Sequence, residues 1–150
     1  MDMHRWAQML IEAFPNLSEE GFEFVEQSSE RYNCIAYAAG DVTELWWPNP
    51  YCYWPPWATY DNRIVSLKEV FAGLDYEQCD DSKAEIGYEK VALYEIQGRF
   101  QHASLQMPNG RWRSKMGPGP VIEHFNPESL SGEVYGNPTI YMRRALNTPI

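Results

Sequence analysis

The thiol of Cys34 is the strongest candidate nucleophile in this chain. It lies in the run from Tyr32 to Gly40 (YNCIAYAAG), whose small and apolar residues with a closing glycine predict a short buried helix. We expect Asn33 to cap the N-terminus of this helix, which places Cys34 in its first turn. The positive end of a helix dipole lowers the pKa of a thiol and raises its thiolate fraction. The alternative interpretation is a small buried residue without a chemical role.

A nucleophilic thiol needs a base, and His102 is the candidate. It lies near the start of a predicted strand from Gln101 to Met107, and the small residues Ala103 and Ser104 leave room for a helix to pack closely. A neutral imidazole on such a strand can take the thiol proton. The alternative interpretation is a structural histidine whose ring is satisfied by its neighbours.

Two residues are candidates for orienting the ring of His102. The sequence Pro108-Asn109-Gly110 predicts a tight turn into a returning strand from Arg111 to Lys115, and Ser114 lies on that strand. His124 ends a further predicted strand and is the alternative third member, although it also fits a position at the edge of a loop. A third member fixes the tautomer of the histidine rather than taking its proton.

The other cysteines and histidines indicate neither a metal nor a cofactor. Cys52 and Cys79 have no helix N-terminus beneath them, and the three cysteines and three histidines lack metal-binding spacing. No glycine-rich loop could hold a phosphate group. We therefore expect no metal site and no cofactor.

The predicted elements favour an α+β fold with a mostly antiparallel sheet, because helices precede most of the strands. Periodicity and caps predict helices over 4–14, 33–40 and 67–74, and strands over 21–27, 88–96, 101–107, 111–115 and 139–143.

The stretch from Trp46 to Tyr60 is neither helix nor central strand, since four of its fifteen residues are proline and seven are aromatic. Its side chains could form a satellite core under a stiff loop. They could also wall a substrate cleft, and the cleft candidates are Trp46, Trp47, Trp54 and Trp57.

The composition limits the kinds of protein that this chain can be. The 150 residues suit one domain, and 22% charged with 44% hydrophobic residues is typical of a folded chain. A formal charge of −9 argues against nucleic-acid binding, and no apolar run is long enough to cross a membrane. With three cysteines and no visible secretory signal, we expect a reduced cytoplasmic protein.

The basic residues are unevenly distributed along the chain. Residues 98–150 carry a net positive charge, and Arg99, Arg111, Arg113 and Lys115 fall in one short region of it. These side chains could pair with the acidic N-terminal half. They could also flank a site for an anionic or carboxylate-bearing substrate.

A cysteine that opens a small-residue helix, followed by a hairpin that carries a histidine, resembles the NlpC/P60-like branch of the papain-like superfamily. The stretches YNCIAYAAG, Trp46-Trp47-Pro48, His102-Ala-Ser and Ser114-Lys-Met-Gly117 also resemble a family of short uncharacterised bacterial proteins. The first resemblance implies one papain-like domain over 1–150, with an N-terminal helical part carrying the cysteine helix and an excursion at 46–60.

The same resemblance implies a hydrolase of an amide bond in a peptide, an isopeptide or a side chain. Cys34 would attack the carbonyl, His102 would move the proton, and Ser114 would steer the ring. Backbone N–H groups of Cys34 and a neighbour such as Asn33 would hold the oxyanion, with Tyr32 close to the site. An acyl or deamidating transferase would use the same residues. The alternative function is a catalytically silent binding module whose aromatic loop engages a partner protein.

Overall fold

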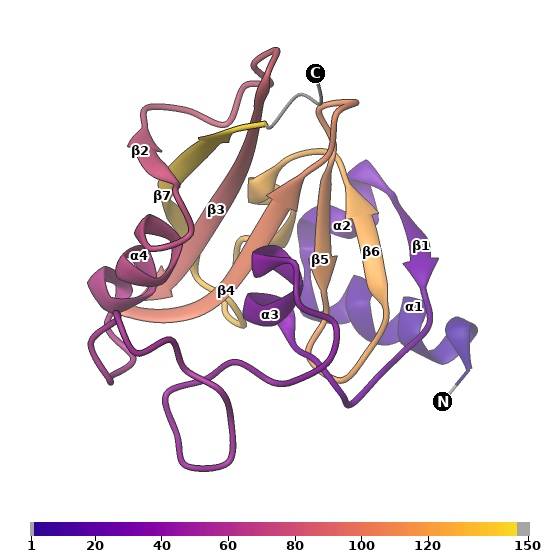
Figure 1. The fold of residues 1–150 in the computed structure, drawn as a ribbon. Helices are drawn as coiled ribbons and strands as arrows, with labels where there is room; N and C mark the ends of the chain where they lie inside the picture. The colour runs from indigo at the N-terminus through magenta and orange to yellow at the C-terminus, as the bar shows by residue number, and fades with distance from the viewer. Residues whose placement is uncertain (1, 147–150) are drawn as a thin grey trace.

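The computed structural model describes residues 2–146, which form a seven-stranded sheet with short helices on both faces (Figure 1). The strand order is β1-β6-β5-β4-β3-β7-β2, and all neighbouring pairs are antiparallel. The strands are β1 (Phe22–Glu26), β2 (Glu77–Cys79), β3 (Tyr88–Ile96), β4 (Arg99–Gln106), β5 (Trp112–Lys115), β6 (Val121–His124) and β7 (Asn137–Ala145). The helices are α1 (Met3–Ala13), α2 (Pro15–Glu20), α3 (Cys34–Ala39), α4 (Ile64–Ala72) and a 3₁₀ turn, η1 (Pro127–Leu130).

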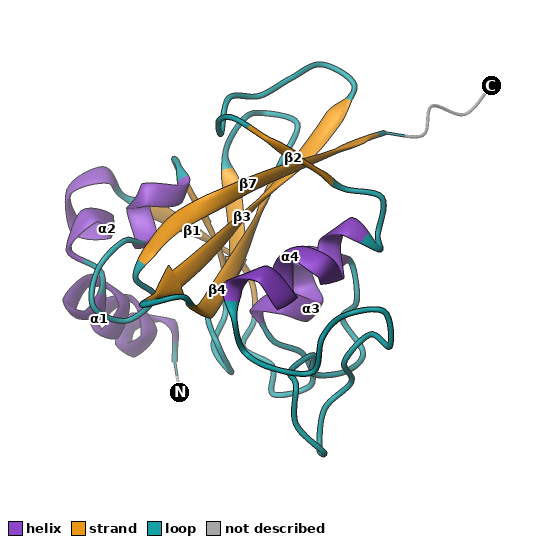
Figure 2. Ribbon diagram, turned by 90° about the vertical axis from the view of Figure 1, so that its left-hand side faces the viewer, coloured by secondary structure: helices purple, strands orange, loops and turns teal. Residues whose placement is uncertain are grey.

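Two apolar cores lie on opposite faces of the sheet. Figure 2 shows α3 and α4 on one side of it and α1 and α2 on the other. Because successive residues of a strand point to opposite faces, β3 contributes to both cores. The α3-side core includes Cys34, Ile35, Leu67, Phe71, Val91, Leu93 and Ala103. The α1-side core includes Leu10, Phe14, Leu17, Ala92, Tyr94, Trp112 and Ile122.

The expected α+β, papain-like arrangement with an N-terminal helical part is wrong. Strand β1 lies between α2 and α3 in the sequence and pairs with β6 at one edge of the sheet. The cysteine helix therefore follows a strand, and the fold is a seven-stranded antiparallel sheet with a few short helices. The physical reason is that pairing joins distant segments, such as Phe22 with His124, which no local pattern records.

The elements nearest the candidate site follow their local signals. Asn33 caps α3, because its Oδ1 accepts a hydrogen bond from the backbone N–H of Ala36 at 3.2 Å. The hairpin from β4 to β5 turns at Gly110, whose φ of 87° is a conformation that favours glycine. These two elements come together, since α3 packs against β4 and β5.

Candidate active site

Cys34 is buried at the first position of α3, and a capping asparagine fixes the chain around it. The Oδ1 of Asn33 also accepts from the backbone N–H of Trp46 at 3.2 Å, and its Nδ2 donates to the Trp46 carbonyl at 2.9 Å. One side chain thus caps the helix and ties it to the start of the aromatic loop.

Burial controls the ionisation of this thiol. It raises the pKa of Cys34 to about 11, although the backbone N–H groups of Ala103, Ile35 and Cys34 itself and the charge of Lys115 act in the opposite direction. The expected lowering of the pKa at the helix N-terminus is therefore outweighed by desolvation. The thiol is protonated at neutral pH in this conformation.

His102 lies fully buried on β4 and makes aromatic contacts only. Its ring stacks on Tyr135 with centroids 4.1 Å apart and an interplanar angle of 10°, and it meets Tyr94 edge-on at 5.1 Å. Neither ring nitrogen has a hydrogen-bond partner among the residues described. Burial, followed by the charge of His124, lowers the pKa of His102 well below its ordinary value, so the ring is neutral.

The main chain of β4 runs between the two candidate catalytic side chains. His102 pairs with Tyr94 of the α1-side core, whereas Ala103 pairs with Leu93 of the α3-side core. Since directly paired residues share a face and successive residues alternate, the ring of His102 lies on the face opposite α3. No hydrogen bond joins this ring to Cys34.

The sheet is open beside this part of β4. Its ladder with β5 ends at Leu105, so His102 and Ala103 have no ladder partner on that side. After burial, the charge of a Cys34 thiolate is the second cause that raises the pKa of Tyr135. The thiol and the ring stacked on His102 are therefore coupled electrostatically across the sheet.

Ser114 contacts His124 and not His102. Its Oγ lies 2.8 Å from Nε2 of His124 and 2.7 Å from Oγ of Ser104. The Nδ1 of His124 lies 2.9 Å from the carbonyl oxygen of Asn126. Both residues proposed to orient His102 thus belong to a separate buried hydrogen-bond network.

This network holds His124 as one neutral tautomer. A carbonyl oxygen only accepts, so Nδ1 carries the proton and Nε2 accepts from Ser114. Burial lowers the pKa of His124 to about 4, against the opposing effects of the Asn126 carbonyl and Glu123. The hydroxyl of Tyr94 extends the network by donating to the Pro127 carbonyl at 2.7 Å.

Sequence reasoning missed Tyr94 and Ser104 as members of this network. The hydroxyl of Ser104 donates to Tyr94 at 3.0 Å. Their signal is the alternation along β4, which puts Ser104 on the same face as His102 and therefore away from α3.

The aromatic loop packs onto the α3-side core instead of forming a separate satellite core, since Trp46, Trp54 and Ala58 belong to that core. Its four cleft candidates pack inward or stay partly covered: Trp46, Trp47, Trp54 and Trp57. Trp54 stacks on Phe100 at 5.6 Å, and the indole N–H of Trp57 donates to the Val70 carbonyl at 3.1 Å. Tyr51 at 94% exposure and Tyr60 at 60% face the solvent instead.

A pocket of about 360 Å³ opens beside the N-terminus of α3. It is lined by Glu30, Tyr32, Asn33, Leu45, Gly117 and Pro118, and none of the four tryptophans is among these residues. The near-site residues Tyr32 and Asn33 therefore lie at a surface opening, next to the buried thiol.

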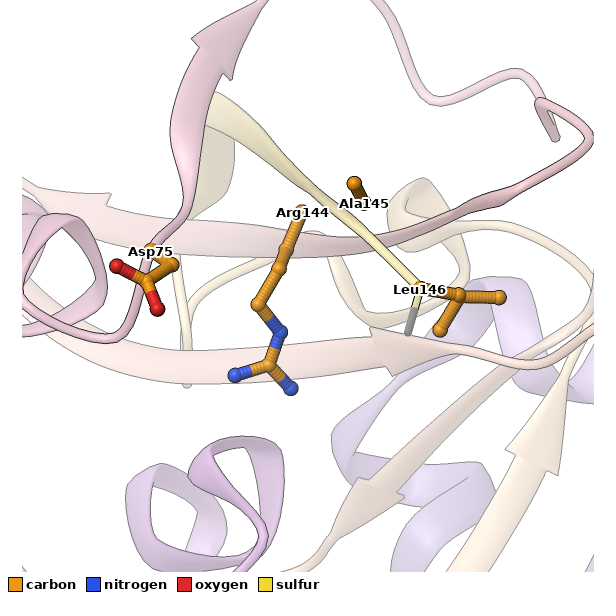
Figure 3. Close-up of a pocket in the computed structure, with 4 residues that line it drawn as sticks. All are labelled: Asp75, Arg144, Ala145 and Leu146. Atoms are coloured by element: carbon orange, nitrogen blue, oxygen red, sulfur yellow. The ribbon is translucent and has the colours of Figure 1, made fainter. Parts of the chain in front are cut away.

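A second cavity, of about 450 Å³, lies near the end of β7 and contains none of the candidate site residues (Figure 3). Its walls are Asp75, Arg144, Ala145 and Leu146. The guanidinium of Arg144 is already occupied, because it pairs with Glu89, donates to the Leu74 carbonyl at 3.1 Å and lies over the ring of Tyr76.

Within residues 2–146, no helix is long and apolar enough to cross a membrane. The same residues contain no group of three or more histidine, cysteine, aspartate or glutamate side chains that could hold a metal ion.

Comparison with known proteins identifies the family of this chain. A family model described as a domain of unknown function (DUF7689) matches residues 23–143. No curated protein and no solved structure matches. The matched range contains Cys34, His102, Ser114 and His124, as well as five of the seven strands in full. The chain therefore belongs to the DUF7689 family.

Proposed function

We propose that this protein is a cysteine-dependent hydrolase of an amide bond in a peptide or protein, with Cys34 as the nucleophile and His102 as the base. The observation that carries the proposal is the buried imidazole without a hydrogen-bond partner, one residue before the Ala103 N–H that faces the Cys34 sulfur. A buried polar group left unpaired costs about 1–3 kcal/mol. Such a group in a folded protein calls for an explanation, and catalysis is one.

The reaction begins with transfer of the Cys34 thiol proton to the neutral ring of His102. The thiolate attacks the amide carbonyl carbon, the C–N bond breaks, and the imidazolium returns the proton to the leaving amine. The acyl group is then a thioester on Cys34. Water, deprotonated by His102, attacks this thioester, releases a carboxylic acid and restores the thiol.

The substrate enters through the 360 Å³ pocket at Tyr32 and Asn33, which borders the first turn of α3. The side chain of Asn33 is committed to the cap and to Trp46, so the oxyanion is held by backbone N–H groups at this turn. Proton transfer also requires the ring of His102 to leave its stack with Tyr135 and to reach the sulfur through the gap between β4 and β5.

The test is the reactivity of Cys34 towards iodoacetamide as a function of pH, read by mass spectrometry in the wild type and in His102→Leu. Cys52 and Cys79, both partly exposed, serve as internal comparison thiols in the same molecule. We expect Cys34 to react at neutral pH in the wild type and to lose this reactivity in His102→Leu. His124→Leu is the matched control, because it removes the other buried imidazole of the same face.

The proposal is contradicted if Cys34 stays unlabelled up to pH 9 while Cys52 and Cys79 react. That result would leave the thiol as a packing group, as its burial and its pKa of about 11 in this structure suggest.

The second candidate function is protein binding through the aromatic loop. The observation that favours it is the exposure of Tyr51, Trp57 and Tyr60 on a segment held by prolines and by internal packing. A photo-crosslinking residue at position 51 should then join one discrete protein. Position 86, where Ile86 is also fully exposed, is the control and should join none.

A further inference from the structure

We propose that Lys115 is a positioning residue for Cys34, whose buried ammonium group is the counter-ion of the thiolate. This inference rests on the proposed function, because a thiolate forms only if Cys34 is the nucleophile. It separates two roles, since His102 moves the proton and Lys115 holds the resulting charge.

The register of the sheet places Lys115 on the face that carries the thiol. Lys115 pairs with Val121, which belongs to the α3-side core together with Cys34. The preceding residue, Ser114, pairs with Ile122 of the α1-side core. Of these two neighbouring residues, only Lys115 therefore lies on the same side of the sheet as Cys34.

The ammonium group of Lys115 is fixed by neutral groups. Its Nζ donates to the Ser29 carbonyl at 2.7 Å and to the carbonyl of Gly117, and it lies 4.9 Å from the ring centroid of Tyr32. The side chain is fully buried. These contacts orient the charge without neutralising it.

Lys115 differs in this respect from the other basic residues of its region. Arg113 pairs with Glu123 at 3.1 Å, and Arg111 lies 3.9 Å from the same carboxylate. Lys115 forms no ion pair with any described residue. A buried charge is expensive to maintain without an opposite charge, and a thiolate on Cys34 would supply one.

The electrostatic coupling acts in both directions. The charge of Lys115 lowers the pKa of Cys34, and Cys34 raises that of Lys115, which burial brings down to about 8. The other ionisable groups on this face are the hydroxyl of Tyr32 and the carboxylate of Glu26, which accepts from Tyr32 at 3.2 Å, while Tyr135 lies across the sheet.

Other charged groups on this side of the sheet lie farther from Cys34. The hydroxyl of Tyr37 is coupled to Arg113, which Glu123 neutralises, and His102 is neutral on the opposite face. Lys115 is thus the cation that acts on the thiol. Since Tyr32 and Gly117 both contact Lys115 and line the 360 Å³ pocket, this charge also lies directly behind the substrate entrance.

The experiment measures the pH profile of iodoacetamide alkylation at Cys34 in the full chain, with Lys115→Met and Lys115→Arg. Methionine keeps the length of the side chain without its charge, and arginine keeps the charge. We expect Lys115→Met to shift the profile upward by at least one pH unit, which is about a tenfold lower rate at a fixed pH below the midpoint. Lys115→Arg should restore most of the rate.

Lys90→Met is the matched control. Lys90 is also fully buried, but it lies on β3 and forms ion pairs with Asp81 and Glu85. Its replacement should leave the profile of Cys34 unchanged. A folded Lys115→Met protein with the wild-type profile would overturn the inference.

A second measurement covers the case in which Lys115→Met does not fold. The ε-methylene resonances of Lys115 follow its titration by NMR in the wild type and in Cys34→Ala. Because Cys34 raises the pKa of Lys115, its removal should lower the titration midpoint, and an unchanged midpoint would contradict the coupling. This readout is independent of catalysis. If Cys34 reacts at neutral pH while the Lys115 midpoint is unchanged in Cys34→Ala, this inference fails and the proposed hydrolase stands. An inert Cys34 would refute both.

Discussion

Replacing His102 with leucine should stabilise the protein, and more so in acid than at neutral pH. Leucine has a volume close to that of histidine and no polar atom, so it removes the two unpartnered ring nitrogens. That removal is worth about 1–3 kcal/mol, and the lost stack on Tyr135 costs about 0.5–1.5 kcal/mol. We expect a net gain of about 1 kcal/mol in the free energy of unfolding at pH 7.5.

Acidification adds a second contribution with a definite sign. The pKa of His102 is well below its ordinary value of 6.5 in the folded state, so below pH 6.5 the unfolded chain binds a proton that the native protein does not. This histidine therefore contributes a loss of stability as the pH falls through that range. The loss grows as the pH falls below 6.5, by at most about 1.4 kcal/mol per pH unit, and it is absent from His102→Leu.

The assay is urea unfolding followed by tryptophan fluorescence at pH 7.5 and pH 5.0. The control is His124→Leu, which removes a second buried neutral ring but also breaks its hydrogen bonds to Ser114 and Asn126. His124→Leu should also lose less stability than the wild type on acidification, because it too lacks one buried neutral imidazole. At pH 7.5, however, it should be less stable than the wild type by about 1–3 kcal/mol. If His102→Leu is destabilised at both pH values, or if its advantage does not grow in acid, the ring of His102 is not an unpaired neutral group and the reasoning fails.

Three further substitutions test other contacts. Asn33→Ala removes the cap of α3 and the tie to the aromatic loop, and denaturant unfolding should show a loss of about 1–2 kcal/mol. Gly136→Ala should cost more than about 2 kcal/mol in the same assay, because the new Cβ would clash with the Glu95 carbonyl oxygen at a φ of 72°. Tyr94→Phe removes the hydrogen bonds to Pro127 and Ser104, and thermal unfolding should show a loss of about 1–2 kcal/mol.

The parts of the fold that the sequence could predict are those with local signals. The cap at Asn33, the turn at Gly110 and the apolar spacing of α1 each act within a few residues, and each was sufficient to locate its element. Helix α4 begins at Ile64, three residues before the predicted start, because Arg63 occupies the N-cap without a side-chain cap and leaves no residue type to recognise.

The architecture could not be predicted because it depends on pairings between distant segments. The strand predicted over 21–27 is present as β1, but nothing near it indicates that Phe22 pairs with His124 and that β1 joins the edge of the sheet. The resemblance to papain-like proteins rests only on a cysteine helix that is followed in the sequence by a hairpin with a histidine. That order does not determine how many strands flank the hairpin.

At the candidate site, the sequence located Cys34 and His102 but not their environment. The helix N-terminus favours a thiolate, yet complete burial raises the pKa of Cys34, and burial is set by the packing of α3 on β4. The place of Ser114 on the returning strand predicts that it orients His102, whereas its side chain contacts His124. Lys115, its neighbour, could have been found from alternation, since residues 114 and 115 must face opposite sides.

The two outer strands of the sheet bear on the behaviour of the protein at high concentration. Strand β1 has exposed Glu23 and Glu26, and β2 is three residues long and begins with exposed Glu77. Free strand edges invite pairing between molecules, and short length and like charges oppose it. Because this protection consists largely of like charges at the surface, dissolved salt weakens it by screening. Pairing of sheet edges between molecules should therefore increase with salt, and a buffer of low ionic strength suits storage of the concentrated protein.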